Sequence, residues 1–520
     1  MKVLLMHAER DFDPAQALRV DERALREDLG LDVLLSVMAG DDELVLEVAH
    51  RALLGESRND RGTVLYRQAV LRDCLNNPET TRALYALAVE AIEAKRHHYF
   101  GGYLSQYPGS ILSGAVGLLE MLTDMLRKLR DIAEANAGRF DSAGFVALFA
   151  MLANELSDDY LAGVRDHLRE LKFKHGMLMS ARLGSGAAAG TEHVLLKPRG
   201  RDGSWLQRIL RKAPPAYSFR LHERDEAGAR IVSDLRNRGL NLVANAVGQS
   251  AEHVLSFFEA LRTELAFYVG CLNLHARLGQ VNLPRCFPSP GSVGTRAHRF
   301  DSLRDPGLAL HLERVPVGNS LDAERRSLVV ITGPNQGGKS SFLRAVGVAQ
   351  LMMQCGMFVA AESFEAELCA GLFTHYKRPE DSSMKSGKFD EEVARMSDIA
   401  DRLEPNSMLL FNESFAATND REGSEIARQI VRALLEKRIK VFFVTHLYDF
   451  AHGYYEQNAA DAVFLRAERQ VDGTRTFRVV EGEPLETSYG EDVYRVVFGA
   501  DGAKPEAPRS EQAVSASAGR

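Results

Sequence analysis

The chain has 520 residues, of which 45% are hydrophobic and 26% are charged, and its formal net charge is −7. This length allows roughly two to four domains, and the composition is that of a folded globular protein. The negative net charge excludes a general attraction to nucleic acid, so any DNA contact needs a local basic patch.

Targeting signals and cysteines indicate the cellular compartment. The five cysteines are scattered without a CxxC pair, which predicts no disulfide framework and indicates a reducing environment. The N-terminus reaches charged residues after a very short apolar run, unlike a signal peptide. No unbroken run of about 18 apolar residues is present, which predicts no membrane span. We therefore expect a cytoplasmic protein, with association with the nucleoid as an alternative.

Residues 1–285 are predicted to form a helical core with lever-like helices. Apolar residues recur at helical spacing from Phe145 to Leu171 and from Val247 to Leu272, and each stretch is predicted as one long helix. Between them, GSGAAAG at 184–190 predicts a flexible loop. Residues 197–224 hold eight Lys or Arg and two acidic residues, so they form either a DNA-backbone contact or a solvated surface loop.

A domain boundary is predicted near residue 285, where Pro284, Pro288 and Pro290 cluster. Residues 286–500 then alternate strand-like and helical runs, which predicts an α/β domain with a mostly parallel sheet. Residues 501–520 are polar and rich in Ala, Ser and Pro, which predicts a disordered tail. The predicted fold class is therefore α + α/β.

The segment LVVITGPNQGGKSSF at 328–342 carries the strongest functional signal. Leu328–Ile331 predicts a buried strand, and the residues from Phe342 onward have helical periodicity. Between them, Gly333–Ser340 fits G-x-x-x-x-G-K-[ST], the phosphate-binding P-loop. Backbone N–H groups of such a loop bind phosphate oxygens, Lys339 is expected to reach the β- and γ-phosphates, and Ser340 to ligate Mg²⁺. The predicted nucleotide-binding residues here are Gly333, Pro334, Asn335, Gln336, Gly337, Gly338, Lys339, Ser340 and Ser341.

Two further strands are predicted to end at the same site. Met408–Phe411 is apolar and is followed by Asn412 and Glu413, and Glu413 is the candidate general base for an attacking water. Asn412 occupies a position where aspartate is usual, and its amide oxygen is expected to bind Mg²⁺ through water without adding negative charge. Val441–Val444 is followed by His446, a candidate sensor of the γ-phosphate.

These motifs, in this order, resemble the ATPase domain of the MutS family of DNA mismatch-repair proteins. Thr332–Ser341 differs at two positions from the family's TGPNMGGKST, and NESFAATNDREG at 412–423 is similar to its DEIGRGTSTYEG. The family's A-T-H corresponds to 444–446, its S-Y-G to 488–490, and the start of its helical core to RQAVLRDCL at 67–75. The resemblance covers roughly residues 20–500.

The resemblance implies an ABC-type ATPase domain at 286–500 that uses ATP and Mg²⁺ and forms a homodimer with composite ATP sites. Ser386 resembles the serine of the family's signature loop, which meets the γ-phosphate bound by the other subunit. Asn319 matches an asparagine that lies near the adenine, and Pro316 stands where the family has an aromatic residue. DNA and repair proteins are the implied partners, without a membrane. The chain resembles a short member that lacks the mismatch-reading domain.

Three functional hypotheses follow. The first is a MutS-like protein that binds and hydrolyses ATP on DNA in repair or recombination, with Glu413, His446 and Lys339 as catalytic residues. The second, suggested by Asn412, is an ATP-dependent clamp with little or no hydrolysis. The third, consistent with the negative net charge, is an ABC-type ATPase that acts on a non-DNA assembly.

Overall fold

A computed structural model describes residues 1–15, 22–55, 60–99, 107–174, 176–181, 193–196, 220–222, 224–378, 387–457, 461–470 and 474–485. Several predictions lie outside these residues: the loop at 184–190, most of the basic segment 197–224, Ser386, the motif at 488–490 and the tail 501–520.

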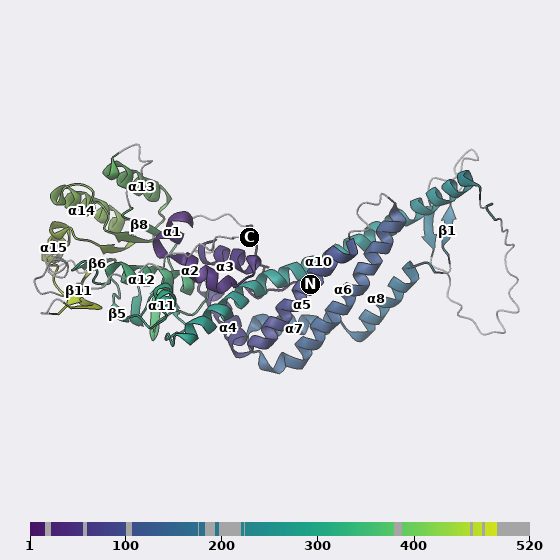
Figure 1. The fold of residues 1–520 in the computed structure, drawn as a ribbon, viewed down its shortest axis with the longest axis horizontal. Coiled ribbons are helices and arrows are strands. Elements are labelled where there is room, and N and C mark those ends of the chain that lie inside the picture. Colours follow the sequence, from purple (N-terminus) through teal and green to yellow (C-terminus); the bar gives the residue numbers. More distant parts are fainter. Residues whose placement is uncertain are drawn as a thin grey trace, which may run out of the picture.

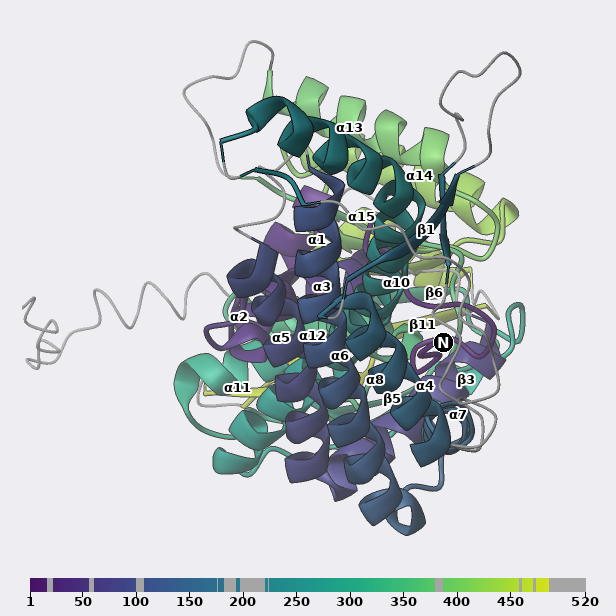
Figure 2. The same cartoon turned by 90° about the vertical axis from the view of Figure 1, so that its right-hand side faces the viewer.

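The molecule is elongated, with a sheet-bearing part at one end and long helices that run to the other (Figure 1). The helices of the first half are α1 (Glu22–Leu29), α2 (Leu31–Ala39), α3 (Glu43–Gly55), α4 (Arg61–Asn76), α5 (Pro78–Tyr99), α6 (Pro108–Asn136), α7 (Ala143–Glu155), α8 (Asp158–Leu171) and α10 (Glu226–Gln280), with the short η1 (Ala137–Arg139). With 55 residues, α10 is about 80 Å long. It packs against α2 to α6, and Figure 2 looks along this bundle.

The predicted helix from Val247 to Leu272 is confirmed as part of α10. The prediction of one helix from Phe145 to Leu171 is wrong, because the chain breaks between α7 and α8. Ser157 caps α8 by accepting a hydrogen bond from the Tyr160 backbone N–H. A serine followed by two aspartates starts a new helix more readily than it continues one. The strand pair β1 (Leu178–Ala181) and β2 (His193–Leu196) follows α8.

One helical stretch, Pro108–Arg139, is long and apolar enough to cross a membrane by length and composition, and it is the only one in the described ranges. The prediction from unbroken apolar runs does not detect it, because polar residues are interspersed. Leu118, Leu122 and Leu129 of α6 are fully buried, and α6 packs against α5, α8 and α10. This packing accounts for its apolar residues as those of a core helix.

The N-terminal segment is held inside the helical part by hydrogen bonds with α4 and α10, and a buried carboxylate accepts three of them. Glu264 of α10 is fully buried and accepts hydrogen bonds from the backbone N–H groups of Leu5 (2.5 Å), Met6 (3.0 Å) and Phe12 (2.7 Å). Burial raises the pKa of Glu264 to about 7, although the three N–H donors favour its charged form. The Tyr268 hydroxyl, one turn further along α10, donates to the Leu5 carbonyl.

The second half contains a six-stranded sheet in the order β12-β11-β6-β10-β9-β8. Its strands are β6 (Leu328–Thr332), β8 (Leu372–Tyr376), β9 (Met408–Asn412), β10 (Lys440–Val444), β11 (Ala462–Arg469) and β12 (Arg475–Glu481), and only β12 is antiparallel. A second sheet has the order β3-β7-β4-β5, formed by Ser289–Gly291, Ser363–Glu367, His298–Leu303 and Asn319–Asp322. The mixed α and α/β fold class is confirmed by this arrangement.

Both faces of the six-stranded sheet are covered. In β6, Val329 and Ile331 face the cluster that contains α12 (Lys339–Gln354), whereas Leu328 and Val330 face the opposite cluster. That second cluster is formed by α13 (Lys388–Arg402), α14 (Asp420–Glu436) and α15 (Tyr448–Glu456). Continuous apolar strands are required by burial on both faces. The strands predicted at 328–331, 408–411 and 441–444 are confirmed within one residue at either end.

Helices from the first half also lie against the sheet-bearing part. α1 contacts α12 and β8, and α3 contacts α12. α2 contacts α11 (Pro306–Leu312), a short helix of the second half, and α10 contacts α11 as well. The division of the chain at residue 285 stays a prediction.

Candidate nucleotide-binding site

The site is built at one edge of the six-stranded sheet. The parallel register places Ile331 of β6 beside Val444 of β10, and Val444 beside Asn412 of β9. The backbone N–H of Glu413 donates to the Val444 carbonyl (2.9 Å), and that of Thr445 to the Ile331 carbonyl (3.0 Å). The residues that follow these three strands therefore converge at the carboxyl edge of the sheet, where ligands of such sheets bind.

The P-loop connects β6 to α12, and its glycines are required by close packing. Gly333 and Gly338 have φ of 114° and 91°, which L side chains rarely adopt. A Cβ on Gly333 would lie 2.9 Å from the Ala467 backbone nitrogen, and one on Gly337 would lie 2.8 Å from the Ala467 Cβ. β11 therefore packs directly against the loop. α12 begins at Lys339, with its N-terminus toward the loop.

Lys339 is almost entirely buried at the start of α12. Its Nζ donates to the carbonyl oxygens of Gly333 (2.8 Å) and Pro334 (2.9 Å), so the side chain folds back along the loop. Burial lowers the pKa of Lys339 to about 8, and the nearby Glu413 carboxylate partly offsets this effect. An anionic phosphate beside Nζ would favour the charged amine, so phosphate binding and protonation of Lys339 are coupled.

Ser340 and Asn412 meet beside the P-loop. The Ser340 hydroxyl donates to Asn412 Oδ1 at 3.0 Å, so the predicted pair of Mg²⁺-shell oxygens is brought together. Both oxygens are neutral, and no cluster of three or more His, Cys, Asp or Glu that could hold a metal occurs among the described residues. Mg²⁺ is commonly held by one or two protein oxygens together with substrate phosphates. The residues fit a metal that arrives with a nucleotide, but not one held by protein alone.

Glu413 and His446 form a contact at the ends of β9 and β10. His446 Nε2 lies 3.1 Å from Glu413 Oε1. The hydrogen bond to His446 is the main reason that the pKa of Glu413 is lowered, and this effect outweighs partial burial. Glu413 is therefore a carboxylate at neutral pH, with its orientation fixed by the imidazole.

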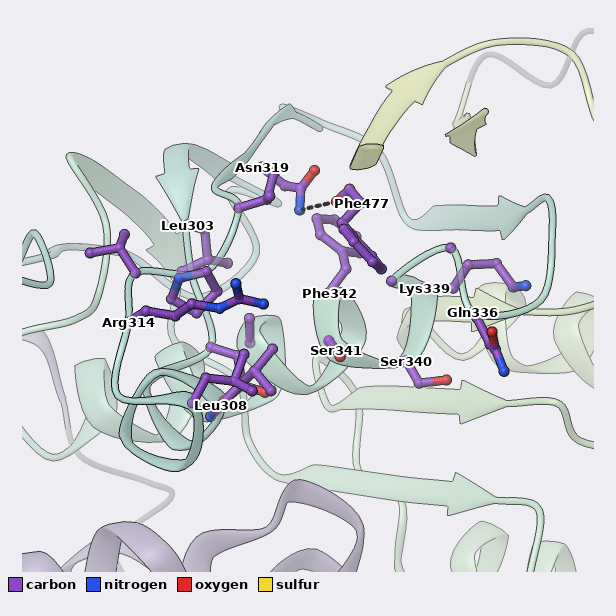
Figure 3. Close-up of a pocket in the computed structure, with 18 of the residues that line it drawn as sticks. Leu303, Leu308, Arg314, Asn319, Gln336, Lys339, Ser340, Ser341, Phe342 and Phe477 are labelled. Atoms are coloured by element: carbon purple, nitrogen blue, oxygen red, sulfur yellow. Dashed lines mark hydrogen bonds between the residues drawn. The ribbon is translucent and has the colours of Figure 1, made fainter. Parts of the chain in front are cut away.

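A cavity of about 620 Å³ opens beside these groups. One end is lined by the predicted residues Asn335 to Ser341 and by Glu413. Four other predicted residues are not in the lining but contact lining residues: Gly333, Pro334, Asn412 and His446. The other end is largely apolar and includes Leu303, Leu308 and Phe342, with the Arg314 side chain directed into the space (Figure 3). A polar end joined to an apolar end suits a phosphate-bearing ligand with a flat ring.

Asn319 lines the cavity, but its amide is engaged by β12. Its Nδ2 donates to the Phe477 carbonyl (3.4 Å), and its Oδ1 accepts from the Val479 N–H (2.7 Å). Asn319 therefore fixes β12 at the cavity. Phe477 has a φ of 59° and is 50% exposed, and its Cα lies 3.5 Å from the position that a Cβ on Gly338 would occupy. Pro316 also lines this end.

Phe477 is the functional candidate that sequence reasoning missed. Its ring lines the cavity near Asn319 (Figure 3). The only signal in the sequence is a lone aromatic residue in the polar strand RTFRVVE. Phe477 lies more than a hundred residues after the P-loop, so the sequence alone gives no reason to place both in one site.

A P-loop at the carboxyl edge of a parallel sheet, with a glutamate and a histidine on neighbouring strands, defines a P-loop nucleotide-binding protein. The family model for the MutS2 N-terminal domain matches residues 59–281, and that for MutS domain V, the ATPase domain of the family, matches residues 329–502. The chain belongs to the MutS family.

Individual relatives agree with this assignment over part of their length. The DNA mismatch repair protein MutS of Thermus aquaticus is 31% identical over 240 residues, which cover 45% of this chain and 28% of the relative. The corresponding protein of Porphyromonas gingivalis is 32% identical over 34% of this chain and 20% of the relative. The MutS protein homolog 4 of Mus musculus is 29% identical over 30% of this chain and 16% of the relative. The matched segments thus span less than a third of these relatives.

The coupling at Lys339 predicts a pH dependence of nucleotide binding. Because the amine has a pKa of about 8 before binding, above that pH a proton must be taken up when phosphates bind. Nucleotide affinity should therefore fall as pH rises from about 8 to about 9.5, and calorimetry in buffers of different ionisation enthalpy should detect proton uptake. Lys339→Arg, which stays charged, should bind without that uptake. Equal proton uptake by the arginine variant would contradict the assignment to Lys339.

Proposed function

We propose that this chain is a MutS-like ATPase that uses ATP and Mg²⁺ and works on DNA as a dimer, in repair or recombination. The observation that supports the proposal is that Lys339, Ser340 and Glu413 line one cavity, with Asn412 bonded to Ser340 and His446 in contact with Glu413. We assign residues 1–285 to a helical core and lever domain, and residues 286–500 to an ABC-type ATPase domain.

Each polar residue has a role in this proposal. The P-loop N–H groups and Lys339 bind the β- and γ-phosphates, and Ser340 with Asn412 positions the metal shell. Mg²⁺, when bound with the nucleotide, neutralises charge on the phosphate oxygens. Glu413, a carboxylate at neutral pH, orients the attacking water and accepts its proton. His446 holds Glu413 in place and faces the γ-phosphate.

We also propose that Phe477 provides the stacking surface for the base, in the absence of an aromatic residue at Pro316. The ring lines the cavity near Asn319, whose amide fixes the strand by hydrogen bonds to the Phe477 carbonyl and the Val479 N–H. Stacking on a planar base is worth about 1–3 kcal/mol in comparable aromatic contacts.

Removal of this ring should weaken the binding of ATP but not that of its phosphates. Phe477→Ala is expected to raise the Kd for ATP roughly 5- to 100-fold, while the Kd for inorganic triphosphate stays the same. Phe477→Trp is the matched control and should preserve ATP binding. An equal loss for ATP and triphosphate would mean that the substitution disturbs the P-loop, against which Phe477 packs.

A second candidate function, a clamp that binds ATP with little hydrolysis, is favoured by Asn412. The Ser340–Asn412 pair carries no negative charge, so metal binding depends more on the nucleotide. Single-turnover ATP hydrolysis by wild type and Asn412→Asp, across a range of Mg²⁺ concentrations, separates the two functions.

If the protein is an ATPase, wild type should turn over, and Asn412→Asp should reach half-maximal rate at a lower Mg²⁺ concentration. If it is a clamp, turnover should appear only in Asn412→Asp. Asn154→Asp, which makes the same charge change at an exposed position of α7, should behave as wild type. Failure of the wild type to bind ATP would reject both functions.

The distal end of α10 is the surface we propose for DNA. This end projects past the other long helices (Figure 1), and Arg230, Arg236 and Arg238 are exposed there. Their side chains make no hydrogen bond or ion pair within the described part of the chain. They adjoin the basic segment 197–224 in sequence. Because this end of α10 also carries the exposed acids Asp225, Glu226 and Asp234, the excess positive charge needed for a phosphate backbone comes from the sequence of 197–224, with eight basic and two acidic residues.

DNA binding at this end should show a characteristic salt dependence. The affinity for duplex, branched and mismatched DNA should fall steeply as salt rises. Reversal of the charge at Arg230, Arg236 and Arg238 should reduce the log–log slope by about 0.9 for each phosphate that is no longer neutralised. Arg432→Glu, at an exposed position of α14, is the control. No binding even at low salt would favour an ATPase that acts on a non-DNA assembly.

The dimer completes the proposal. Ser386, which lies outside the described residues, is assigned to the loop that meets the nucleotide of the other subunit. Repair proteins are the proposed additional partners.

A further inference from the structure

The segment that carries Glu413 has an unusual backbone. Glu413 and Phe415 have φ of 55° and 63°, and neither is glycine. A non-glycine residue in this left-handed conformation costs about 1–3 kcal/mol of free energy, and the conformation persists only where several surrounding contacts hold it. Ser414, between them, is fully buried. The contacts that hold residues 413–415 therefore decide where the Glu413 carboxylate lies.

Ser414 is held by His375 of β8. Its Oγ donates to the His375 carbonyl oxygen at 2.5 Å and lies 2.7 Å from Nδ1 of the same residue. The His375 ring is fully buried and stacks on Phe415, with ring centroids 5.4 Å apart and an interplanar angle of 19°. One hydroxyl thus joins the turn after β9 to both the backbone and the side chain of the neighbouring strand.

Phe415 is held by α13. The Glu392 side chain is 3% exposed, and its Oε2 accepts the backbone N–H of Phe415 at 3.0 Å. The backbone carbonyl of Glu392 lies 3.0 Å from His375 Nε2. Glu392 therefore contacts both Phe415 of the turn and His375, the residue that holds Ser414. On the other side, the Phe415 carbonyl lies against Gly423 of α14, where a Cβ would clash with it.

Ser414, His375 and Glu392 do not line the cavity. Their contacts nevertheless hold residues 413–415, the segment that carries the Glu413 side chain. Glu392 also carries a desolvation cost, since its Oε1 has no hydrogen-bond partner within the described chain. A buried carboxylate of this kind is expensive to keep for packing alone. Its one side-chain hydrogen bond is to the strained turn.

We propose that Glu392 and Ser414 are positioning residues for hydrolysis, which hold the left-handed turn at 413–415 so that Glu413 points at the attacking water. This inference rests on the proposed ATPase function. It ties the position of α13 to the geometry of Glu413, because the Glu392 side chain connects the two.

The test compares Glu392→Met, Glu392→Gln and Ser414→Ala with wild type and with Glu436→Met, an exposed glutamate of α14. Methionine fills similar space without an acceptor, whereas glutamine keeps an oxygen for the Phe415 N–H. We measure kcat for ATP, the Kd for a non-hydrolysable ATP analogue, thermal unfolding, and amide hydrogen exchange of residues 413–417.

Glu392→Met and Ser414→Ala should lower kcat roughly 10- to 100-fold with the Kd changed less than about 3-fold, since a displaced base acts on the transition state only. Amide exchange at 413–417 should rise in Glu392→Met. Glu392→Gln should recover most of the rate and the protection, and Glu436→Met should match wild type.

Two results would overturn the inference: an unchanged kcat in Glu392→Met, or an equal loss in the glutamine and methionine variants. If wild type itself does not hydrolyse ATP, the proposed function fails, and hydrogen exchange still decides whether Glu392 holds the turn. Unchanged protection at 413–417 in Glu392→Met would then reject its role.

Discussion

The parallel pairing of β8, β9, β10 and β6 is the constraint on which the site depends. Because these strands share one direction and register, the residues after each of them emerge at the same edge. Asn412 and Glu413 come from one strand, His446 follows another, and the P-loop follows a third. Burial of both sheet faces fixes this register, since a slip of one residue would exchange the faces of every side chain.

Electrostatic balance within the site follows from this convergence. Lys339 is the buried cation and Glu413 the nearby anion, while Ser340 and Asn412 contribute only neutral oxygens. An aspartate at position 412 would add a second negative charge beside Lys339. The site is therefore less negative than the family motif implies, which lowers the repulsion of a polyphosphate and also weakens the protein's own hold on a divalent metal.

Sequence patterns predict the parts of this protein that depend on local physics. The strands at 328–331, 408–411 and 441–444 are apolar throughout because they are buried on both sides, and the P-loop glycines are required by close contacts with β11. The break between α7 and α8 is missed because helical spacing almost continues across Ser157. Phe477, His375 and Glu392 are missed for another reason: their contacts join segments far apart in the chain, and no periodicity reports such contacts.

The N-terminal segment carries a consequence for the order of folding. Val3, Leu5 and Met6 are buried, and the acceptor for the Leu5 N–H, Glu264, lies 259 residues further along the chain. Contacts of such separation form late, because the loop between them must first be ordered. Contacts with α4, where the Tyr66 hydroxyl donates to the Leu4 carbonyl and Arg67 Nε to the Met6 carbonyl, span only about 60 residues and can form earlier than those with α10. The backbone N–H groups of Leu5, Met6 and Phe12 therefore gain their acceptor, Glu264, only when the segment before α10 has been ordered.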